Sequence, residues 1–472
     1  MKGLWLRTSI LVLSLSSVAF GQVTWDFLGG GARAQGMGKA FYAISDDITA
    51  VTWNPAGLAK QEKPILGFTK AAFVPRGAFQ DLGQHGLVDR SVNGRYEQNQ
   101  SFNSFSFIGF LAPLRIRGHQ FVLSAAYNRA FDEYLTTSYF DTGQVSTVVS
   151  TGSGPIDTVF TPAEISQSTD ADIAPYTFSV GFGTRFYKSW DLGVSLNVYT
   201  GRAISHYNSR YLAPDYVPID RLGQTVVYDG IVRVTDTTKY GGFNLVIGTK
   251  YTSPSFDLGF VVKTAFSLRQ KSNLVNEFVT YYNGLPTFAL TTFNDFPLSK
   301  VKVPFTFAGG IVYRFSPIWS GSFDAEYRPW SGKKVLDRYA IIIRSGRSNQ
   351  EFYNTVDPRW FNSIALRAGT EYMLATGGAV IPKIPLRAGV GFLKLPGPSY
   401  ELPSGSNSGT ITQADWGTFS KSMLTLSAGS GIYWEQIHLD AAYSYSGYGQ
   451  DFPYGQMKNK NHSFSLTFTG YF

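Results

Sequence analysis

Apolar and polar residues alternate along most of the chain after residue 60, in segments separated by Gly, Pro, Ser and Asn. In one such segment Phe178, Val180 and Phe182 fall on one face of an extended strand, and Thr177 and Ser179 fall on the other. This period predicts β-strands that are apolar on one face and polar on the other. About fourteen strands are predicted from it, near residues 65–74, 101–112, 119–129, 175–187, 190–202, 240–252, 255–268, 303–315, 319–330, 361–374, 384–394, 421–433, 437–447 and 461–472.

The gaps between these segments alternate between long and short. The long gaps are polar and rich in Gly, Pro, Ser and Asn, and they are expected to be loops: residues 75–100, 130–174, 203–239, 269–302, 331–360, 395–420 and 448–460. The intervening turns, such as Ser189 and Ser253-Pro254, are mostly short. Long loops at one end and short turns at the other are typical of bacterial outer-membrane barrels with an even number of strands. The predicted fold class is therefore all-β, a transmembrane antiparallel β-barrel of about 14 strands with both termini on the periplasmic side.

Composition agrees with a barrel rather than a helical membrane protein. Aromatic and charged residues each make up 16% of the chain, and the mean hydropathy is −0.07. No segment after the first twenty residues has the roughly 18 consecutive apolar residues of a membrane-spanning helix. A soluble all-β protein and a transmembrane barrel remain, and the one-sided distribution of long loops favours the barrel.

Charged residues on the polar faces of the strands indicate which face points inward. Facing lipid near the midplane, each basic side chain would cost about 2 to 4 kcal/mol, so these residues are expected to line the lumen. They are Arg314, Asp324, Glu326, Arg328, Arg367, Glu371 and Arg387. Two interpretations stay open: a lumen lined for solutes, or a network of ion pairs that fills the barrel and holds a plug.

The first residues predict export. Lys2 and Arg7 precede an apolar run from Ser9 to Phe20, and Ala19-Phe20-Gly21 has the small residues of a cleavage site. The apolar run is too short to span about 30 Å as a retained anchor. The predicted organisation is a signal peptide at 1–21, an N-terminal hatch at 22–60 and an outer-membrane β-barrel at 61–472. The predicted location is the bacterial outer membrane.

Charge and motifs argue against nucleic acid and against catalysis. The net charge is +8, but the basic residues are scattered, so we expect loop and rim Arg and Lys to meet outer-leaflet lipid and lipopolysaccharide phosphates instead. Cys is absent and the 5 His residues lie far apart, which leaves no metal-ligand spacing. The glycine-rich segment lacks the Walker spacing, and there is no Gly-x-Ser-x-Gly elbow. We therefore expect neither an enzyme nor a cofactor, and a monomer by default.

Residues 29–59 do not alternate and contain too much Gly for a membrane strand. Their position and size suit a small plug inside the barrel. Asp46 or Asp47 is expected to cap a short helix from Thr49 to Trp53. The Asn54-Pro55 step is expected to end it, because the residue before Pro disfavours the helical region.

The order GARAQGMGKAF (residues 31–41) and SDDITAVTWNPAGLA (residues 45–59) resembles the hatch of the FadL family, outer-membrane transporters of long-chain fatty acids and aromatic hydrocarbons. Asn54-Pro55-Ala56 matches the Asn-Pro-Ala hatch motif of that family. Later segments agree: Val303-Pro304-Phe305, Asp324 to Trp330, Pro385 to Gly389, and Leu439 to Tyr443. The last strand, which ends on Phe472, resembles the insertion signal read by the barrel-assembly machinery.

The resemblance implies a channel for passive uptake of hydrophobic small molecules, with Asn54, Pro55, Ala56, Gly36 and Gly38 as hatch and gating residues. In this family the ligand is captured by extracellular loops, reaches a pocket against the hatch, and leaves sideways into the membrane. An alternative is that the Asn-Pro-Ala motif only ends a helix and packs the plug.

Other functions also stay open. The hatch and fold are similar to the outer-membrane shuttle of the type IX secretion system, which binds cargo proteins, and an enzyme or a structural barrel is a third class. The ligand is not determined, since fatty acids and hydrocarbons need the same apolar lining. A capture groove is expected around Phe140, Val159, Phe160, Tyr207, Tyr211 and Tyr216.

Overall fold

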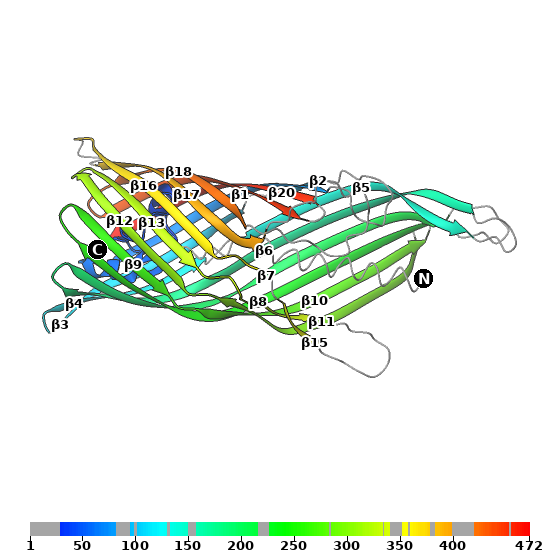
Figure 1. The fold of residues 1–472 in the computed structure, drawn as a ribbon, viewed down its shortest axis with the longest axis horizontal. Helices are drawn as coiled ribbons and strands as arrows, with labels where there is room; N and C mark the ends of the chain where they lie inside the picture. The colour runs from blue at the N-terminus through cyan, green and yellow to red at the C-terminus, as the bar shows by residue number, and fades with distance from the viewer. Residues whose placement is uncertain are drawn as a thin grey trace.

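The computed structural model is a long β-barrel (Figure 1). It describes residues 29–81, 95–98, 102–129, 133–149, 157–215, 226–282, 285–333, 335–339, 352–356, 359–377, 383–398, 420–452 and 455–472. The predicted signal peptide at 1–21 lies outside these residues, as do the side chains of the predicted capture groove.

The strands of the described residues form one sheet of 20 segments. They are β1 Ile65–Asp81, β2 Arg95–Gln98, β3 Phe102–Ile116, β4 His119–Arg129, β5 Glu133–Val149, β6 Asp157–Tyr187, β7 Trp190–Asp215, β8 Val226–Thr252, β9 Phe256–Lys263, β10 Phe266–Tyr282, β11 Leu285–Val303, β12 Thr306–Ser316, β13 Trp319–Arg328, β14 Val335–Tyr339, β15 Phe352–Val356, β16 Ser363–Ala375, β17 Lys383–Pro398, β18 Ser420–Tyr433, β19 Ile437–Phe452 and β20 Gly455–Tyr471.

The sheet closes on itself. The first strand, β1, pairs antiparallel with β3 on one side and with the last strand, β20, on the other, from Ile65↔Tyr471 to Asp81↔Gly455. A closed ladder satisfies the backbone groups that an open edge would leave unpaired in lipid. The segments make up a closed antiparallel barrel of 14 wall strands, which confirms the predicted fold class and strand number.

The difference between segments and wall strands arises because several wall strands are broken in two. The halves of one strand follow each other along the wall and pair with the same neighbours: β2 and β3, β4 and β5, β9 and β10, β11 and β12, β13 and β14, and β15 and β16.

The prediction that residues 130–174, 203–239, 269–302 and 448–460 are loops is largely wrong. In the last of these segments β19 runs to Phe452 and β20 begins at Gly455. Strands β5 to β8, β10 and β11 extend through much of the other segments as antiparallel ladders. The prediction relied on alternation, which only a strand with one face in lipid needs. Strand extensions beyond the membrane can be polar on both faces, because water solvates both.

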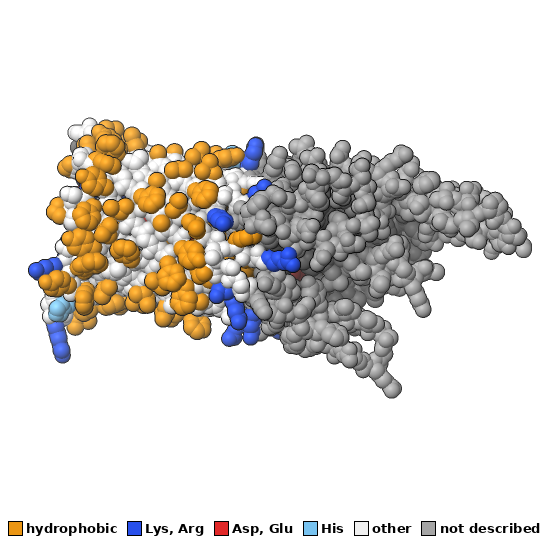
Figure 2. All heavy atoms as spheres, in the orientation of Figure 1, with side chains coloured by type: hydrophobic (Ala, Val, Ile, Leu, Met, Phe, Trp, Pro, Cys, Tyr) orange, Lys and Arg blue, Asp and Glu red, His pale blue; other side chains and the backbone are white. Residues whose placement is uncertain are grey.

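The outer surface carries the apolar band that alternation predicted (Figure 2). Phe178, Val180 and Phe182 are 53%, 61% and 36% exposed, whereas Thr177 and Ser179 are buried inside. On the last strand Phe464 and Leu466 also point outward, and Phe472 is exposed at the end of the chain. Apolar side chains therefore face outward and polar side chains face the lumen.

The described part of the predicted hatch, residues 29–60, lies inside the barrel. It contains three short helices: α2 Ala32–Gly36, α3 Ala50–Trp53 and the 3₁₀ helix η1 Pro55–Lys60. None of the helices in the described residues is long and apolar enough to cross a membrane. The prediction that Asn54-Pro55 ends the second helix is confirmed, since Asn54 is extended at φ −141° and ψ 102°.

Candidate functional site

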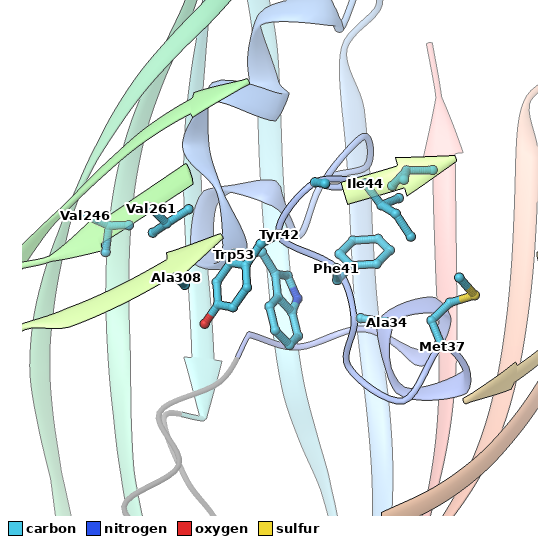
Figure 3. Close-up of a cluster of buried hydrophobic side chains, with 11 residues drawn as sticks. Ala34, Met37, Phe41, Tyr42, Ile44, Trp53, Val246, Val261 and Ala308 are labelled. Carbon is cyan, nitrogen blue, oxygen red and sulfur yellow. The ribbon is translucent and has the colours of Figure 1, made fainter. Parts of the chain in front are cut away.

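The hatch has its own aromatic core, which packs directly against the barrel wall. Trp53 makes edge contacts with Phe41 and Tyr42, with ring centroids 5.9 Å and 5.7 Å apart. Figure 3 shows these rings next to Val246 of β8 and Val261 of β9, in one buried cluster. Hatch and wall therefore share a hydrophobic core, and the hatch cannot leave the barrel without exposing it.

Asn54 joins two parts of the hatch to the wall. Its side-chain oxygen accepts a hydrogen bond from the backbone N–H of Ala56 at 3.1 Å. Its side-chain amide donates to the carbonyl oxygens of Tyr42, at 2.9 Å, and Thr249, at 3.2 Å. The side chain is fully buried. Asn54 thus caps η1 and holds the hatch to β8 by hydrogen bonds. This is the packing role that the sequence offered as an alternative to gating.

Close packing explains the glycines around the Asn-Pro step. A Cβ at Gly193 of β7 would lie 2.1 Å from the carbonyl carbon of Pro55, and one at Gly248 of β8 would lie 2.0 Å from Asn54 Oδ1. Within the hatch, Gly38 has φ +65° and a Cβ there would meet Val390 N at 2.7 Å. Gly36 faces Gly429 and accepts a hydrogen bond from Ser427 Oγ at 3.1 Å.

Arg33 connects the first hatch helix to the wall. Its Nε and Nη2 donate to the two carboxylate oxygens of Glu371 on β16, both at 2.9 Å, and its Nη1 donates to Asp46 at 2.5 Å. Glu371 also accepts from Arg387, which in turn donates to Asp440 at 2.6 Å. Burial alone lowers the pKa of Arg33, but the carboxylates of Asp46 and Glu371 outweigh it and raise that pKa above its usual value. The guanidinium therefore stays charged.

Tyr42 is the second connection. Its backbone N–H donates to Asp324 at 2.8 Å and its hydroxyl donates to Glu326 at 2.7 Å, both on β13. Glu326 is also paired with Arg367, at 3.0 Å, and with Arg328. Burial and the neighbouring Glu326 raise the pKa of Tyr42 well above its usual value, so the hydroxyl keeps its proton at physiological pH.

The seven predicted lumen charges therefore all point inward, but they do not line an open path. Six of them form the two networks around Arg33 and Tyr42. Arg314 lies in a third network at the end with the short turns, where it donates to Asp257 at 2.6 Å. The buried Lys250 also pairs with Asp257, at 3.6 Å, and donates to the carbonyl oxygen of Ile44 in the hatch. This arrangement matches the second interpretation above, in which ion pairs fill the barrel and hold a plug.

A different, apolar surface lies inside the barrel beyond the ion pairs of Glu326, on the side away from the short turns. Apolar and aromatic side chains cluster inside the barrel, where a porin lumen would be polar. Tyr199 stacks on Phe266 with ring centroids 4.5 Å apart, and Trp330 meets Trp360 at 5.1 Å. We call the whole set the lumen cluster: Tyr199, Tyr240, Phe266, Leu268, Val301, Val303, Trp330 and Trp360.

The wall is interrupted beside the lumen cluster. Strand breaks occur between Lys263 and Phe266, between Val303 and Thr306, and across residues 329–333 and 359–362. Register places them side by side, since Lys263 pairs with Thr306 and Arg328 pairs with Ser363. Four neighbouring wall strands are thus broken at one level. Turn hydrogen bonds replace the ladder there, such as Trp330 N–H to the Arg328 carbonyl at 3.0 Å.

A cavity of about 220 Å³ lies on the opposite side of the hatch, at the end with the short turns. Most of the residues that line it are polar or charged, including Arg33, Asp46, His438, Asp440 and Tyr471. Such a lining does not suit an apolar ligand. Across the described ranges no group of three or more His, Cys, Asp or Glu side chains is arranged to hold a metal ion.

The roles of Arg33, Tyr42 and the lumen cluster were not predicted from the sequence. Leu268, Val301 and Val303 are apolar residues at inward positions, and this parity was a usable signal. The Pro329-Trp330 and Arg359-Trp360 steps break the alternation at the same level. Arg33 and Tyr42 gave no such signal, because their partners are far away in the chain.

Fold and site together define a transmembrane-type antiparallel barrel with an internal hatch and a buried apolar cluster inside the wall. The structure is similar to the Pseudomonas putida toluene transporter TodX, with TM-score 0.58, 11% identity and coverage of 95% of this chain and 99% of TodX. The Ralstonia pickettii toluene transporter TbuX matches at TM-score 0.57 and 14% identity, covering 95% and 100%. A FadL homologue of Pseudomonas aeruginosa matches at TM-score 0.52 and 14% identity, covering 94% and 98%.

No protein-family model and no curated protein sequence matches the chain. The resemblance to the FadL family is confirmed at the level of the fold, which is what identities of 11 to 14% can show. The similar structures are transport channels rather than enzymes.

Proposed function

We propose that this protein is an outer-membrane channel for passive uptake of hydrophobic small molecules. One observation carries the proposal: the lumen cluster lies on the inner side of the interrupted wall. A cluster of aromatic and aliphatic side chains at this level favours apolar ligands, since about 25 cal/mol is gained for each Å² of apolar surface removed from water. The names of the similar structures, toluene transporters and a FadL homologue, point to the same ligand class.

The proposed route is lateral. Below the lumen cluster the interior is filled by Glu326 with Arg328 and Arg367, and then by the hatch. An apolar molecule gains nothing by entering this charged layer, because it would have to displace ion pairs without replacing them. The hatch is held by Arg33, Tyr42 and Asn54 and acts as a floor that directs the ligand sideways. The adjacent break in the wall is the route into the membrane.

Several finer parts belong to the same proposal. Loops and strand tips at the long end capture the ligand, Phe472 is the signal for the assembly machinery, and the chain works as a monomer. Gating requires only a local movement at the wall break. The secretion-shuttle alternative is not favoured, because the similar structures are named as channels and transporters.

Uptake measurements in a Gram-negative host without its own hydrophobic-solute channels test the proposal. Cells that produce the protein are expected to take up labelled oleate or toluene faster than cells with an empty vector. Val303 is 4% exposed in the lumen cluster. The Val303→Asn variant should reduce uptake several-fold, because it places an amide in the apolar cluster.

Val303→Leu is the matched control, since Leu has the same branched heavy-atom skeleton as Asn but keeps the site apolar. Both variants should reach the membrane in equal amounts and show the heat-modifiable gel mobility of a folded barrel. Equal uptake by wild type, Asn and Leu variants would remove the lumen cluster from the pathway. Uptake no greater than that of empty-vector cells would refute the channel function itself.

A further inference from the structure

A second surface of the molecule is unusual in its charge. Basic side chains project from the outer face of four adjacent wall strands, β7, β8, β10 and β11. We call them the basic patch: Arg202, Lys239, Arg269, Lys271, Lys300 and Lys302. Lys300 is half-buried and the other five are exposed.

Strand register places these residues next to one another. Arg202 pairs with Lys239, and Lys239 pairs with Lys271, so three like charges stand in one row across three strands. In the adjacent row Arg269 pairs with Lys300. Side chains directly opposite on one face of a sheet lie about 5 Å apart at Cβ. The patch is therefore a compact set of positive charges rather than scattered surface residues.

The sheet does not neutralise these charges itself. In the described ranges none of the six side chains forms an ion pair. Outward neighbours along the strands, such as Thr200, Thr237, Gly241 and Asn273, are uncharged. Like charges placed directly opposite one another destabilise a sheet. The contrast is Arg233, nearer the tip of β8, which faces Glu277 at 4.0 Å on the same outer surface.

The position of the basic patch along the barrel axis shows which groups can neutralise its charge. Arg202 lies four residues beyond the outward-facing Val198, and Lys239 lies four residues before the outward-facing Phe243, which is 69% exposed. Four residues of strand span about 13 Å along a tilted strand. Figure 2 shows Lys and Arg side chains gathered where the apolar band ends, on the side away from the short turns. This is the level of lipid headgroups in the leaflet that faces the long loops.

We propose that the basic patch binds the phosphate groups of lipopolysaccharide in the outer leaflet. Several phosphates on one rigid glycolipid match a compact set of cations better than a single phospholipid headgroup does. Charge-assisted hydrogen bonds from Lys and Arg to phosphate are short and strong. They also replace the divalent cations that otherwise neutralise these phosphates. The inference rests on the outer-membrane location but not on the transport function.

The test is the amount of lipopolysaccharide that stays with the purified protein. Protein is extracted from outer membranes in mild detergent, washed, and analysed for bound lipopolysaccharide by native mass spectrometry. The variant carries Lys239→Gln, Arg269→Gln and Lys271→Gln. Each basic residue near an anionic surface contributes on the order of fivefold in binding, so retention should fall more than tenfold. Retention by the wild type should also weaken as salt is added.

The matched control removes three positive charges at the opposite end of the barrel: Arg115→Gln, Arg117→Gln and Lys188→Gln. All three residues are exposed near the short turns. The control should retain lipopolysaccharide like the wild type. Equal retention of lipopolysaccharide by the two triple variants would overturn the proposal. It would also be overturned if the wild type bound phosphatidylglycerol nanodiscs as tightly as it binds lipopolysaccharide. Hydrocarbon uptake through the Val303 series is measured separately, so failure of this proposal leaves the transport function intact.

Discussion

Arg33 of the hatch and Glu371 of the barrel wall face each other through two parallel hydrogen bonds, each 2.9 Å long. The geometry is that of a bidentate guanidinium–carboxylate pair, which fixes orientation as well as distance. The Arg33 side chain is 18% exposed and that of Glu371 is 11% exposed, so water screens the pair little. It determines how the first hatch helix sits against β16.

Arg33→Lys should loosen the hatch although the charge is kept. Lys is a point charge and cannot hold both oxygens of Glu371 while also reaching Asp46. Loss of these bonds should cost about 1 to 3 kcal/mol in hatch docking. Hydrogen exchange of the hatch backbone, residues 32–61, measures this directly. Arg117→Lys in an exposed turn is the control, and equal protection in both variants would argue against the proposed role.

Asn54→Asp should produce a pH-dependent hatch. The introduced carboxylate can still accept from Ala56 but can no longer donate to the carbonyl oxygens of Tyr42 and Thr249, which repel it. At neutral pH the hatch should lose about 2 to 4 kcal/mol. The folded state raises the pKa of the new group, so protonation favours docking: stability should return as the pH falls and disappear as it rises. Hatch protection that is independent of pH between 4 and 8, roughly the range around a raised carboxyl pKa, would contradict this.

Tyr42→Phe should reveal an alkaline instability of the wild type. The folded hatch raises the pKa of Tyr42 above its usual value. Its stabilising contribution is therefore complete below the unfolded pKa of about 10 and is lost as the pH rises through the folded pKa. Below about pH 9 the variant should be less stable by about 1 to 3 kcal/mol, because Glu326 loses a buried donor.

The difference in unfolding free energy between wild type and Tyr42→Phe should shrink above about pH 10. Denaturant unfolding at several pH values gives this difference, and the other tyrosines cancel in it. A difference that grows with pH would show that the hydroxyl is not held in its protonated form.

Gly193→Ala should displace the hatch. The new Cβ would lie 2.1 Å from the carbonyl carbon of Pro55, which is backbone and cannot simply rotate away. Overpacking of this kind typically costs about 1 to 3 kcal/mol. Gly241→Ala on the next strand is the control, since its Cβ would meet nothing within 4 Å. Similar hatch protection in the two alanine variants would show that the Asn-Pro step does not press against β7.

The barrel was predictable because its signal is local. A pleated strand sends successive side chains to opposite faces, so Phe178, Val180 and Phe182 identify a strand with one apolar face without knowledge of its neighbours. Asn54-Pro55 likewise ends a helix through the geometry of Pro alone. Strand ends were predicted too short, as on β6, since alternation stops being required where both faces meet water.

The sequence by itself determined a wall of about 14 strands and, on strands such as β6 and β20, which side chains face outward. Only the tertiary structure decided that Arg33 binds Glu371, 338 positions away, and that Tyr42 binds Glu326. It also decided that Val303, Trp330 and Trp360 meet at one break in the wall. The physical reason is that these contacts depend on the stagger between strands, which is set when the barrel closes. Alternation within a strand carries no information about that stagger.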